Sequence, residues 1–371
     1  MDYNIVGMPS RYIQGRDILN RIDKFVANYG KKFLLLTDKI VYELISDKMK
    51  LAFDSSGLKF VWLEFDGECT ESEIARACKF FSENKFDAII GAGGGRAVDA
   101  AKAVGFYCKT NTIIFPTIAA TDAPCSFHAI INEENEAPRL LYVLKAPDLV
   151  LVDVDIIAKA PVRTLVAGIG DAFATYYEAR ACMQANSNTN LGGLTNLDSG
   201  KGLRMKSAYA LAELCNDMLL EDGVKAKIAA ENQTVTKALE NIIEANIFLS
   251  GAGFVNNGCA VAHSFFNGVA SLPRRQDFMH GEYVAFGTLV QLVLENVPFE
   301  EFEAVQKFYK SVGLPLTLKD IGLDKLSDDE MKKAVDVAME NKITHNMPFK
   351  VTAESFMDAI VNADYLGKQH L

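Results

Sequence analysis

The first part of the chain alternates short apolar runs with segments of helical periodicity. β-rich apolar runs occupy residues 33–37, 60–65, 88–90, 112–115 and 149–152. Between them, residues 71–84 place Ile74, Ala77, Cys78 and Phe81 at helical spacing, and residues 96–106 carry an Ala/Val face. Alternation of strand, helix and strand predicts a parallel sheet flanked by helices.

The pattern changes after Pro161, where strand signals end and long helical patterns begin. These patterns predict helices at residues 165–185, 207–219, 225–250 and 281–295. We therefore expect an α/β domain at residues 1–161 and an all-helical domain at residues 162–371. Two apolar runs within residues 129–144 predict a hairpin added to the sheet. Residues 186–202, rich in Asn, Gly, Ser and Thr, predict a solvent-exposed loop.

Composition narrows the class of protein. The 371 residues carry a formal net charge of -10, which disfavours nucleic acid and anionic membrane surfaces as partners. The seven cysteines form no CxxC pair, which argues against a disulfide framework or a thiolate zinc site. The N-terminus has no basic, apolar secretory pattern, and no apolar run is long enough to span a bilayer. We expect a cytoplasmic protein.

A glycine-rich turn is the first candidate for chemistry. Gly91-Ala92-Gly93-Gly94-Gly95-Arg96 follows an apolar strand and opens a helix, the setting in which backbone amides receive a phosphate. The standard dinucleotide fingerprint is incomplete, so a plain strand-to-helix turn is an equal alternative. Asp38 ends another strand, where it either binds an adenosine ribose, favouring NAD over NADP, or caps the next helix.

Two of the five histidines are candidate metal ligands, together with one aspartate. His263 lies in a helix of small and apolar residues, His280 begins another helix, and Asp171 sits in the glycine hinge Gly168-Ile169-Gly170-Asp171. Two imidazoles and a carboxylate suit a catalytic zinc ion with an open coordination position. Taken one by one, however, a hydrogen-bonded core histidine, a helix-start residue and an N-cap aspartate explain them equally well.

Several motifs resemble those of the bacterial glycerol dehydrogenases, a branch of the iron-containing alcohol dehydrogenase superfamily. They are Pro116-Thr117-Ile118-Ala119-Ala120-Thr121-Asp122-Ala123-Pro124, Ala167-Gly168-Ile169-Gly170-Asp171, His280-Gly281-Glu282 and His345-Asn346-Met347-Pro348. The resemblance covers essentially the whole chain. It implies an α/β NAD-binding domain, an all-helical domain that binds metal and substrate, an active site in the cleft between them, and a homo-oligomer, often an octamer. His345 does not match a ligand position and is interpreted as structural.

The resemblance also assigns roles to single residues. It implies that Asp171, His263 and His280 hold one zinc ion per subunit and that Asp122 contacts a small polyol substrate. It implies NAD contacts at Asp38, Gly94, Gly95, Arg96, Asp99, Thr117, Ala120, Ser126, His128 and Asn132. The implied reaction is NAD-dependent oxidation of glycerol, or a related vicinal diol, to the hydroxyketone, with the ion as Lewis acid and hydride passing to the nicotinamide.

Departures from the family pattern keep alternatives open. Arg96 stands where lysine is usual, Ala120 where serine is frequent, His128 where an apolar residue is usual, and Asn132 where tyrosine is common. Arg274 and Arg275 form a solvated turn or, if they face the cleft, favour an anionic substrate such as a hydroxycarboxylate or glycerol phosphate. A lyase resembling dehydroquinate synthase is a further alternative, against which Thr121-Asp122-Ala123-Pro124 argues.

Overall fold

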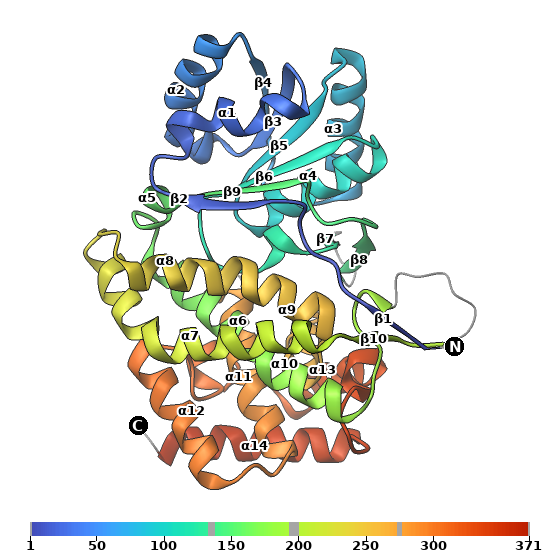
Figure 1. Ribbon diagram of the computed structural model, residues 1–371. Coiled ribbons are helices and arrows are strands. Elements are labelled where there is room, and N and C mark those ends of the chain that lie inside the picture. Colours follow the sequence, from blue (N-terminus) through green and yellow to red (C-terminus); the bar gives the residue numbers. More distant parts are fainter. Residues whose placement is uncertain (1, 133–137, 193–199, 273–276, 370–371) are drawn as a thin grey trace.

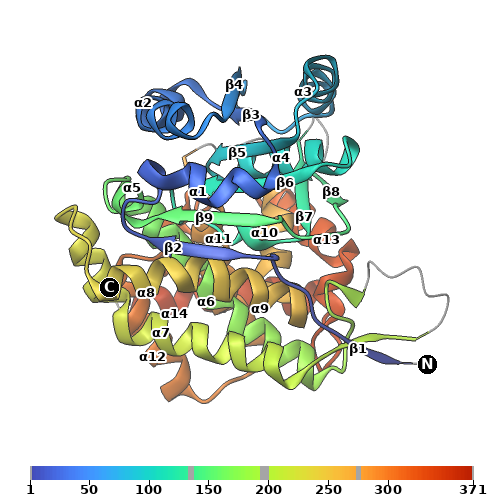
Figure 2. The ribbon, with the colours of Figure 1, turned by 45° about the horizontal axis from the view of Figure 1, so that its top comes forward.

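The computed structural model describes residues 2–132, 138–192, 200–272 and 277–369. Figure 1 shows a sheet with flanking helices above a second part built of helices, and the N-terminal strand lies beside this helical part. Figure 2, turned about the horizontal axis, shows the same two parts, and shows the N-terminal segment running from the helical part to the sheet.

A six-stranded parallel sheet forms the first part, in the order β2-β9-β6-β5-β3-β4. All five apolar runs singled out in the sequence are confirmed as strands. The sequence did not predict the strand β2, because its four residues are too few to show a hydrophobic period. The strands are β2 (Tyr12–Gly15), β3 (Lys32–Thr37), β4 (Lys59–Glu64), β5 (Ala88–Gly93), β6 (Asn111–Pro116) and β9 (Leu149–Asp153).

The central strands are buried on both faces. Successive residues of a strand point to opposite sides, so Phe33 and Leu35 pack with α1 (Ile22–Val26) and α2 (Lys39–Ser56). Leu34 and Leu36 instead join the core that includes α3 (Glu71–Asn84) and α4 (Gly95–Tyr107). This second core continues without a break into the helical part. Burial on both faces explains why these strands read as continuous apolar runs.

The helical part begins after the short helix α5 (Val154–Ile157). The predicted helices at residues 165–185 and 281–295 are confirmed to within a few residues, as α6 and α11. A π-helical turn, Ala245–Leu249, joins two of the helices. The helices are α6 (Val162–Gln184), α7 (Lys206–Glu231), α8 (Lys237–Glu244), α9 (Ser250–Asn257), α10 (Val261–Ala270), α11 (His280–Leu294), α12 (Phe299–Val312), α13 (Asp328–Glu340) and α14 (Ala353–Gln369).

The predicted division between helices at residues 207–219 and 225–250 is wrong. Helix α7 continues through Gly223 to Glu231, and the break comes later, where the Thr236 side chain caps α8 by accepting from Leu239 N at 3.2 Å. Gly223 permits close packing instead of a break, because a Cβ there would lie 3.0 Å from Cε2 of Phe308. Tertiary packing overrides the weak helix propensity of glycine.

The predicted hairpin exists but does not join the main sheet. β7 (His128–Ile131) and β8 (Arg139–Tyr142) form a separate antiparallel pair. Two side chains of α4 hydrogen-bond to the backbone of β7. The Lys102 ammonium donates to the carbonyl oxygen of His128, and Asp99 Oδ2 accepts from Ile130 N at 3.1 Å. Residues 133–137 lie outside the described residues.

The N-terminal strand belongs spatially to the helical part. β1 (Tyr3–Ile5) pairs in parallel with β10 (Gly202–Arg204), and the Gly7 amide donates to Asn256 Oδ1 at 2.7 Å. The expectation of a solvent-exposed loop at residues 186–202 is met only in part in its described portion, since Asn186 and Asn188 are exposed whereas Thr189 and Leu191 are buried. Residues 193–199 of that loop lie outside the described residues.

Candidate metal centre and cofactor cleft

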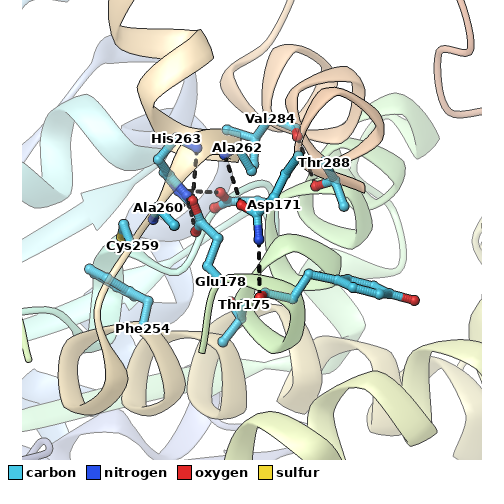
Figure 3. Close-up of polar contacts among 12 residues, drawn as sticks. Asp171, Thr175, Glu178, Phe254, Cys259, Ala260, Ala262, His263, Val284 and Thr288 are labelled. Atoms are coloured by element: carbon cyan, nitrogen blue, oxygen red, sulfur yellow. Dashed lines mark hydrogen bonds and ion pairs between the residues drawn. The ribbon is translucent and has the colours of Figure 1, made fainter. Parts of the chain in front are cut away.

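One face of α6 supplies two carboxylates to the candidate site. Asp171, Thr175 and Glu178 are spaced by four and three residues, so they lie along the same side of the helix. All three are buried, with Asp171 and Glu178 at 1% and 0% exposure. Figure 3 shows both carboxylates beside His263, which comes from α10.

The structure brings the three predicted metal ligands together. His280 Nε2 lies 3.0 Å and His263 Nε2 lies 3.4 Å from Asp171 Oδ1. One potential ligand atom from each residue lies within 4.8 Å of the other two. The three side chains come from α6, α10 and the first residue of α11, so only the tertiary fold unites them.

Glycines allow the backbones around Asp171 to approach closely. A Cβ on Gly281 would lie 1.8 Å from the carbonyl oxygen of Ala167, and one on Gly168 would lie 1.9 Å from that of Ala119. Gly170 is similarly close to Gly281, at 2.4 Å from its oxygen. The expected glycine hinge, and the N-cap role weighed for Asp171, are both wrong, because Asp171 lies well inside the continuous helix α6. Gly170 and Gly281 instead set the close separation between the helices that carry Asp171 and His280.

The residues present fit a divalent ion. Among the described residues, no well-directed hydrogen bond reaches the buried Oδ1 of Asp171, although two imidazole nitrogens surround it. Zinc binds nitrogen and oxygen at roughly 2.0–2.1 Å, so ligand atoms on a tetrahedral ion lie about 3.3 Å apart, close to the observed separations. Burial would raise the pKa of Asp171, but the imidazoles of His280 and His263 lower it below its usual value.

Asp122, the residue predicted to contact the substrate, lies next to this cluster. Its amide donates to Asp171 Oδ2 at 3.4 Å, and its carboxylate Oδ2 accepts from the Ser250 hydroxyl at 2.6 Å. Ser250 in turn lies 3.0 Å from the Thr175 hydroxyl. Burial, reinforced by the negative charge of Asp171, raises the pKa of Asp122 to about 8. Ser250 and Thr175 carry no sequence signal that distinguishes them from ordinary helix residues.

Asp38, Gly94 and Thr117 directly follow the carboxyl ends of β3, β5 and β6. The chain connections after the neighbouring strands β3 and β5 lead to opposite faces of the sheet, the topology at which parallel α/β sheets bind nucleotides. Gly93 has φ 136°, Gly94 is the N-cap of α4, and Thr117 N donates to Gly93 O at 3.2 Å. The helix N-terminus beside this turn suits a phosphate.

Asp38 takes the capping role that the sequence left open. Its Oδ1 accepts from Val41 N at 2.9 Å and so caps α2. Its Oδ2 faces the glycine turn, 3.9 Å from where a Cβ on Gly93 would lie. Helix capping and a ribose contact are therefore compatible, because they use different oxygens.

Arg96 and Asn132 meet at a third residue. Arg96 Nη1 donates to Glu68 Oε1 at 2.6 Å, and Asn132 Nδ2 donates to Glu68 Oε2 at 3.3 Å. The Arg96 side chain is 62% exposed. The guanidinium is thus directed to Glu68, a carboxylate on the loop after β4 that the sequence did not single out.

Lys102 organises three further candidate residues. Its buried ammonium lies 2.9 Å from Asp99 Oδ1 and donates to Ser126 Oγ at 2.8 Å and to the His128 carbonyl oxygen. It also donates to Ala123 O at 2.8 Å, next to Asp122. Asp99, Ser126 and His128 therefore form one network that links the helix after the glycine turn to the Asp122 loop. Lys102 itself has no signal in the sequence beyond its place in an apolar helix.

The remaining candidates have simpler surroundings. Ala120 is buried beside Ala119, whose carbonyl oxygen accepts from Asn246 Nδ2 at 3.0 Å. The His128 ring packs against Tyr142 and Phe254, with centroids 4.9 and 5.8 Å away. His345 Nε2 lies 3.1 Å from Met339 O, away from the cluster of Asp171. Arg274 and Arg275 lie outside the described residues.

The comparisons with known proteins identify the family. Over 369 residues the chain is 42% identical to the glycerol dehydrogenase of Citrobacter freundii, covering 99% of both proteins. A family model described as iron-containing alcohol dehydrogenase matches residues 9–154. The chain belongs to this family. It is accordingly an oxidoreductase, and its relatives at about 40% identity carry the name glycerol dehydrogenase.

Solved structures of the family share the whole architecture. A probable glycerol dehydrogenase from Sinorhizobium meliloti, 37% identical, superposes with a TM-score of 0.91 over 99% of both chains. The glycerol dehydrogenase of Schizosaccharomyces pombe, 30% identical, gives a TM-score of 0.93 over 100% of this chain and 92% of the other. The α/β and helical parts of the fold are thereby confirmed as those of the family. Within the described ranges, no helix is long and apolar enough to cross a membrane.

Proposed function

We propose that this protein oxidises glycerol, or a related vicinal diol, to the hydroxyketone with NAD as hydride acceptor. The observation that carries the proposal is the convergence of Asp171, His263 and His280 beside Asp122. The glycine turn is close by, since a Cβ on Gly95 would lie 3.5 Å from Oγ1 of Thr121, the neighbour of Asp122. The names of the full-length relatives support the choice of substrate.

The three ligands would hold one zinc ion. When bound, the ion supplies a Lewis acid that lowers the pKa of the substrate hydroxyl. The protein supplies orientation: Asp122, fixed by Ser250, accepts a hydrogen bond from a neighbouring substrate hydroxyl. A second hydroxyl on the adjacent carbon hydrogen-bonds to the oxygen of Asp122 that Ser250 does not occupy, whereas a simple alcohol leaves that buried oxygen without this hydrogen bond. This difference favours a diol over a monoalcohol.

The NAD site would lie along the carboxyl ends of β3, β5 and β6. The backbone amides at Gly94 and Gly95, at the start of α4, receive the pyrophosphate, and Asp38 Oδ2 accepts from the adenosine ribose. The proposed NAD contacts beyond that turn are those that the family resemblance implies, at Asp99, Thr117, Ala120, Ser126, His128 and Asn132. Arg96 adds a cation near the turn while it pairs with Glu68.

Domain limits, assembly and location complete the proposal. Residues 1–161 form the NAD-binding domain and residues 162–371 the domain that binds metal and substrate, with β1 pairing across to the second. The chain assembles as a homo-oligomer, an octamer by resemblance, in the cytoplasm. The seven unpaired thiols suit a reducing compartment.

The test is NAD reduction by enzyme stripped of metal with a chelator and then reloaded with zinc. We expect turnover of glycerol and 1,2-propanediol, little with lactate or glycerol 1-phosphate, and recovery only on zinc addition. Asp171→Asn should bind no zinc and remain folded, whereas Asp217→Asn, at an exposed carboxylate on α7, should behave as wild type. Full activity of the stripped enzyme would refute the metal role, and preference for the anionic substrates would refute the polyol.

A further inference from the structure

A second carboxylate of α6 contacts the opposite side of the His263 ring. Glu178 is 0% exposed, and its Oε2 lies 2.6 Å from His263 Nδ1. Its other oxygen, Oε1, accepts from the backbone amides of Ala260 and His263 at 2.8 and 2.9 Å. Both oxygens of this buried carboxylate are therefore engaged with one short segment of chain (Figure 3).

The two ring nitrogens of His263 face two different carboxylates of the same helix. Nδ1 faces Glu178, while Nε2 lies 3.4 Å from Asp171 Oδ1. The two carboxylates are seven residues apart, two turns along one face of α6, so the imidazole bridges them. A proton on Nδ1 satisfies Glu178 and leaves the lone pair of Nε2 directed to the Asp171 side.

Glu178 is not itself placed as a ligand of the same ion. It reaches His263 from the side of the ring opposite to the Asp171 cluster, and its oxygens are occupied by a ring N–H and two amides. Cys259 lies close to Glu178 and His263, but its Sγ accepts a hydrogen bond from Asn190 Nδ2 at 3.4 Å, and both oxygens of Glu178 are already engaged with N–H donors. A separate ion between these three residues is therefore disfavoured.

We propose that Glu178 is a positioning residue that fixes the ring orientation and tautomer of His263 and anchors the start of α10, and so sets the metal affinity of the site. The proposal rests on the proposed metal role of Asp171, His263 and His280. Glu178 also has a second role, which does not depend on the His263 ring. Although it belongs to α6, its carboxylate accepts from two amides at the start of α10 and so stabilises the beginning of that helix.

Glu178→Gln separates these contributions without changing the shape of the side chain. If the amide oxygen keeps the two backbone amides, its NH₂ group faces Nδ1 and forces the ring proton onto Nε2, where it blocks metal binding. If the amide turns over, its NH₂ group faces two backbone N–H donors. Either arrangement disfavours the tautomer that binds metal.

The measurement is the dissociation constant for zinc alone, from competition with a chromogenic chelator. We expect Glu178→Gln to weaken zinc binding about 10–100-fold. Glu73→Gln is the matched control, because Glu73 is also buried and hydrogen-bonded, to Arg76 in α3, yet remote from the cluster. In a His263→Ala background, Glu178→Gln should cause no further loss. Unchanged zinc affinity in a folded Glu178→Gln protein, or an equal further loss without His263, would overturn the proposal.

Two further readouts keep the proposal testable. If Glu178→Gln does not fold, cobalt-substituted wild-type enzyme gives strongly shifted signals for the ring N–H of each histidine ligand. We expect the His263 signal to exchange with D₂O more slowly than that of His280, whose side chain is more exposed; the absence of a slowly exchanging His263 N–H would overturn the proposal. If Asp171→Asn also leaves zinc affinity unchanged, the proposed function fails; if only Glu178→Gln does, the positioning role alone fails.

Discussion

The close contact between α6 and α11 can be tested by adding a single methyl group. A Cβ on Gly281 would lie 1.8 Å from Ala167 O, 2.7 Å from Ala167 C and 3.0 Å from Asp171 N. All three are backbone atoms, so no flexible side chain can move aside. To restore an ordinary carbon–oxygen contact, Gly281→Ala must separate the helices by about 1.5 Å.

This separation acts directly on the proposed metal site, because His280 precedes Gly281 and its Nε2 lies 3.0 Å from Asp171 Oδ1. Overpacking of this kind costs roughly 1–3 kcal/mol of folding free energy. A ligand displaced by about 1 Å also costs on the order of 100-fold in turnover. We therefore expect Gly281→Ala to lose both stability and zinc affinity.

Urea unfolding and chelator competition measure the two effects separately. Gly15→Ala is the control, because its added Cβ would meet only Ile18 Cδ1, at an ordinary 3.7 Å. If Gly281→Ala unfolds at the same urea concentration as wild type and binds zinc within threefold of it, close backbone contact does not set the geometry of the site.

The remaining predictions concern the network around Lys102. Burial, with Lys102 contributing, lowers the pKa of His128 to about 3. The unfolded chain takes up this proton below about pH 6.5, so wild type loses roughly 2 kcal/mol of stability between pH 7 and pH 5, and His128→Phe should remove that loss. Equal acid sensitivity of both proteins in urea unfolding would contradict this. Lys102→Met leaves Asp99 unpaired and should cost about 3–5 kcal/mol, whereas Asp99→Asn with Lys102→Met should unfold at higher urea than the single variant; the reverse order would refute the pairing.

Local sequence patterns predicted which segments form strands and helices better than they predicted which segments pair with one another. The runs that became β3, β5 and β6 were evident because burial on both faces leaves nothing but apolar residues. The β1–β10 pairing was not, since three-residue strands carry no period and their partners are far apart in the chain. The hairpin was predicted but misplaced, because the groups that bind its backbone, Lys102 and Asp99, lie in a helix whose pattern only shows an apolar face.

For the candidate site, too, the local sequence predicted the separate residues but not how they come together. Asp171, His263 and His280 each had an equally good local explanation, and the resemblance to a family selected them together. The geometry then adds what neither source contained. Glu178 looks like an ordinary helical glutamate, and its only sequence signal is the spacing of seven residues from Asp171. Glu68 and Lys102 acquire meaning only from the residues that the fold brings to them.

Because β1 pairs with β10 in the helical part, the chain passes between the two parts of the molecule twice. Residues 6–11 cross from β1 to the outer strand β2 of the sheet, and the residues after β9 cross back to α6 (Figure 1). Strand β1 and Gly7 are hydrogen-bonded to β10 and Asn256, so the N-terminal end of the chain is held to the helical part, although the next strand, β2, belongs to the sheet. A tag fused before residue 2 would therefore emerge beside the helices and not beside the sheet.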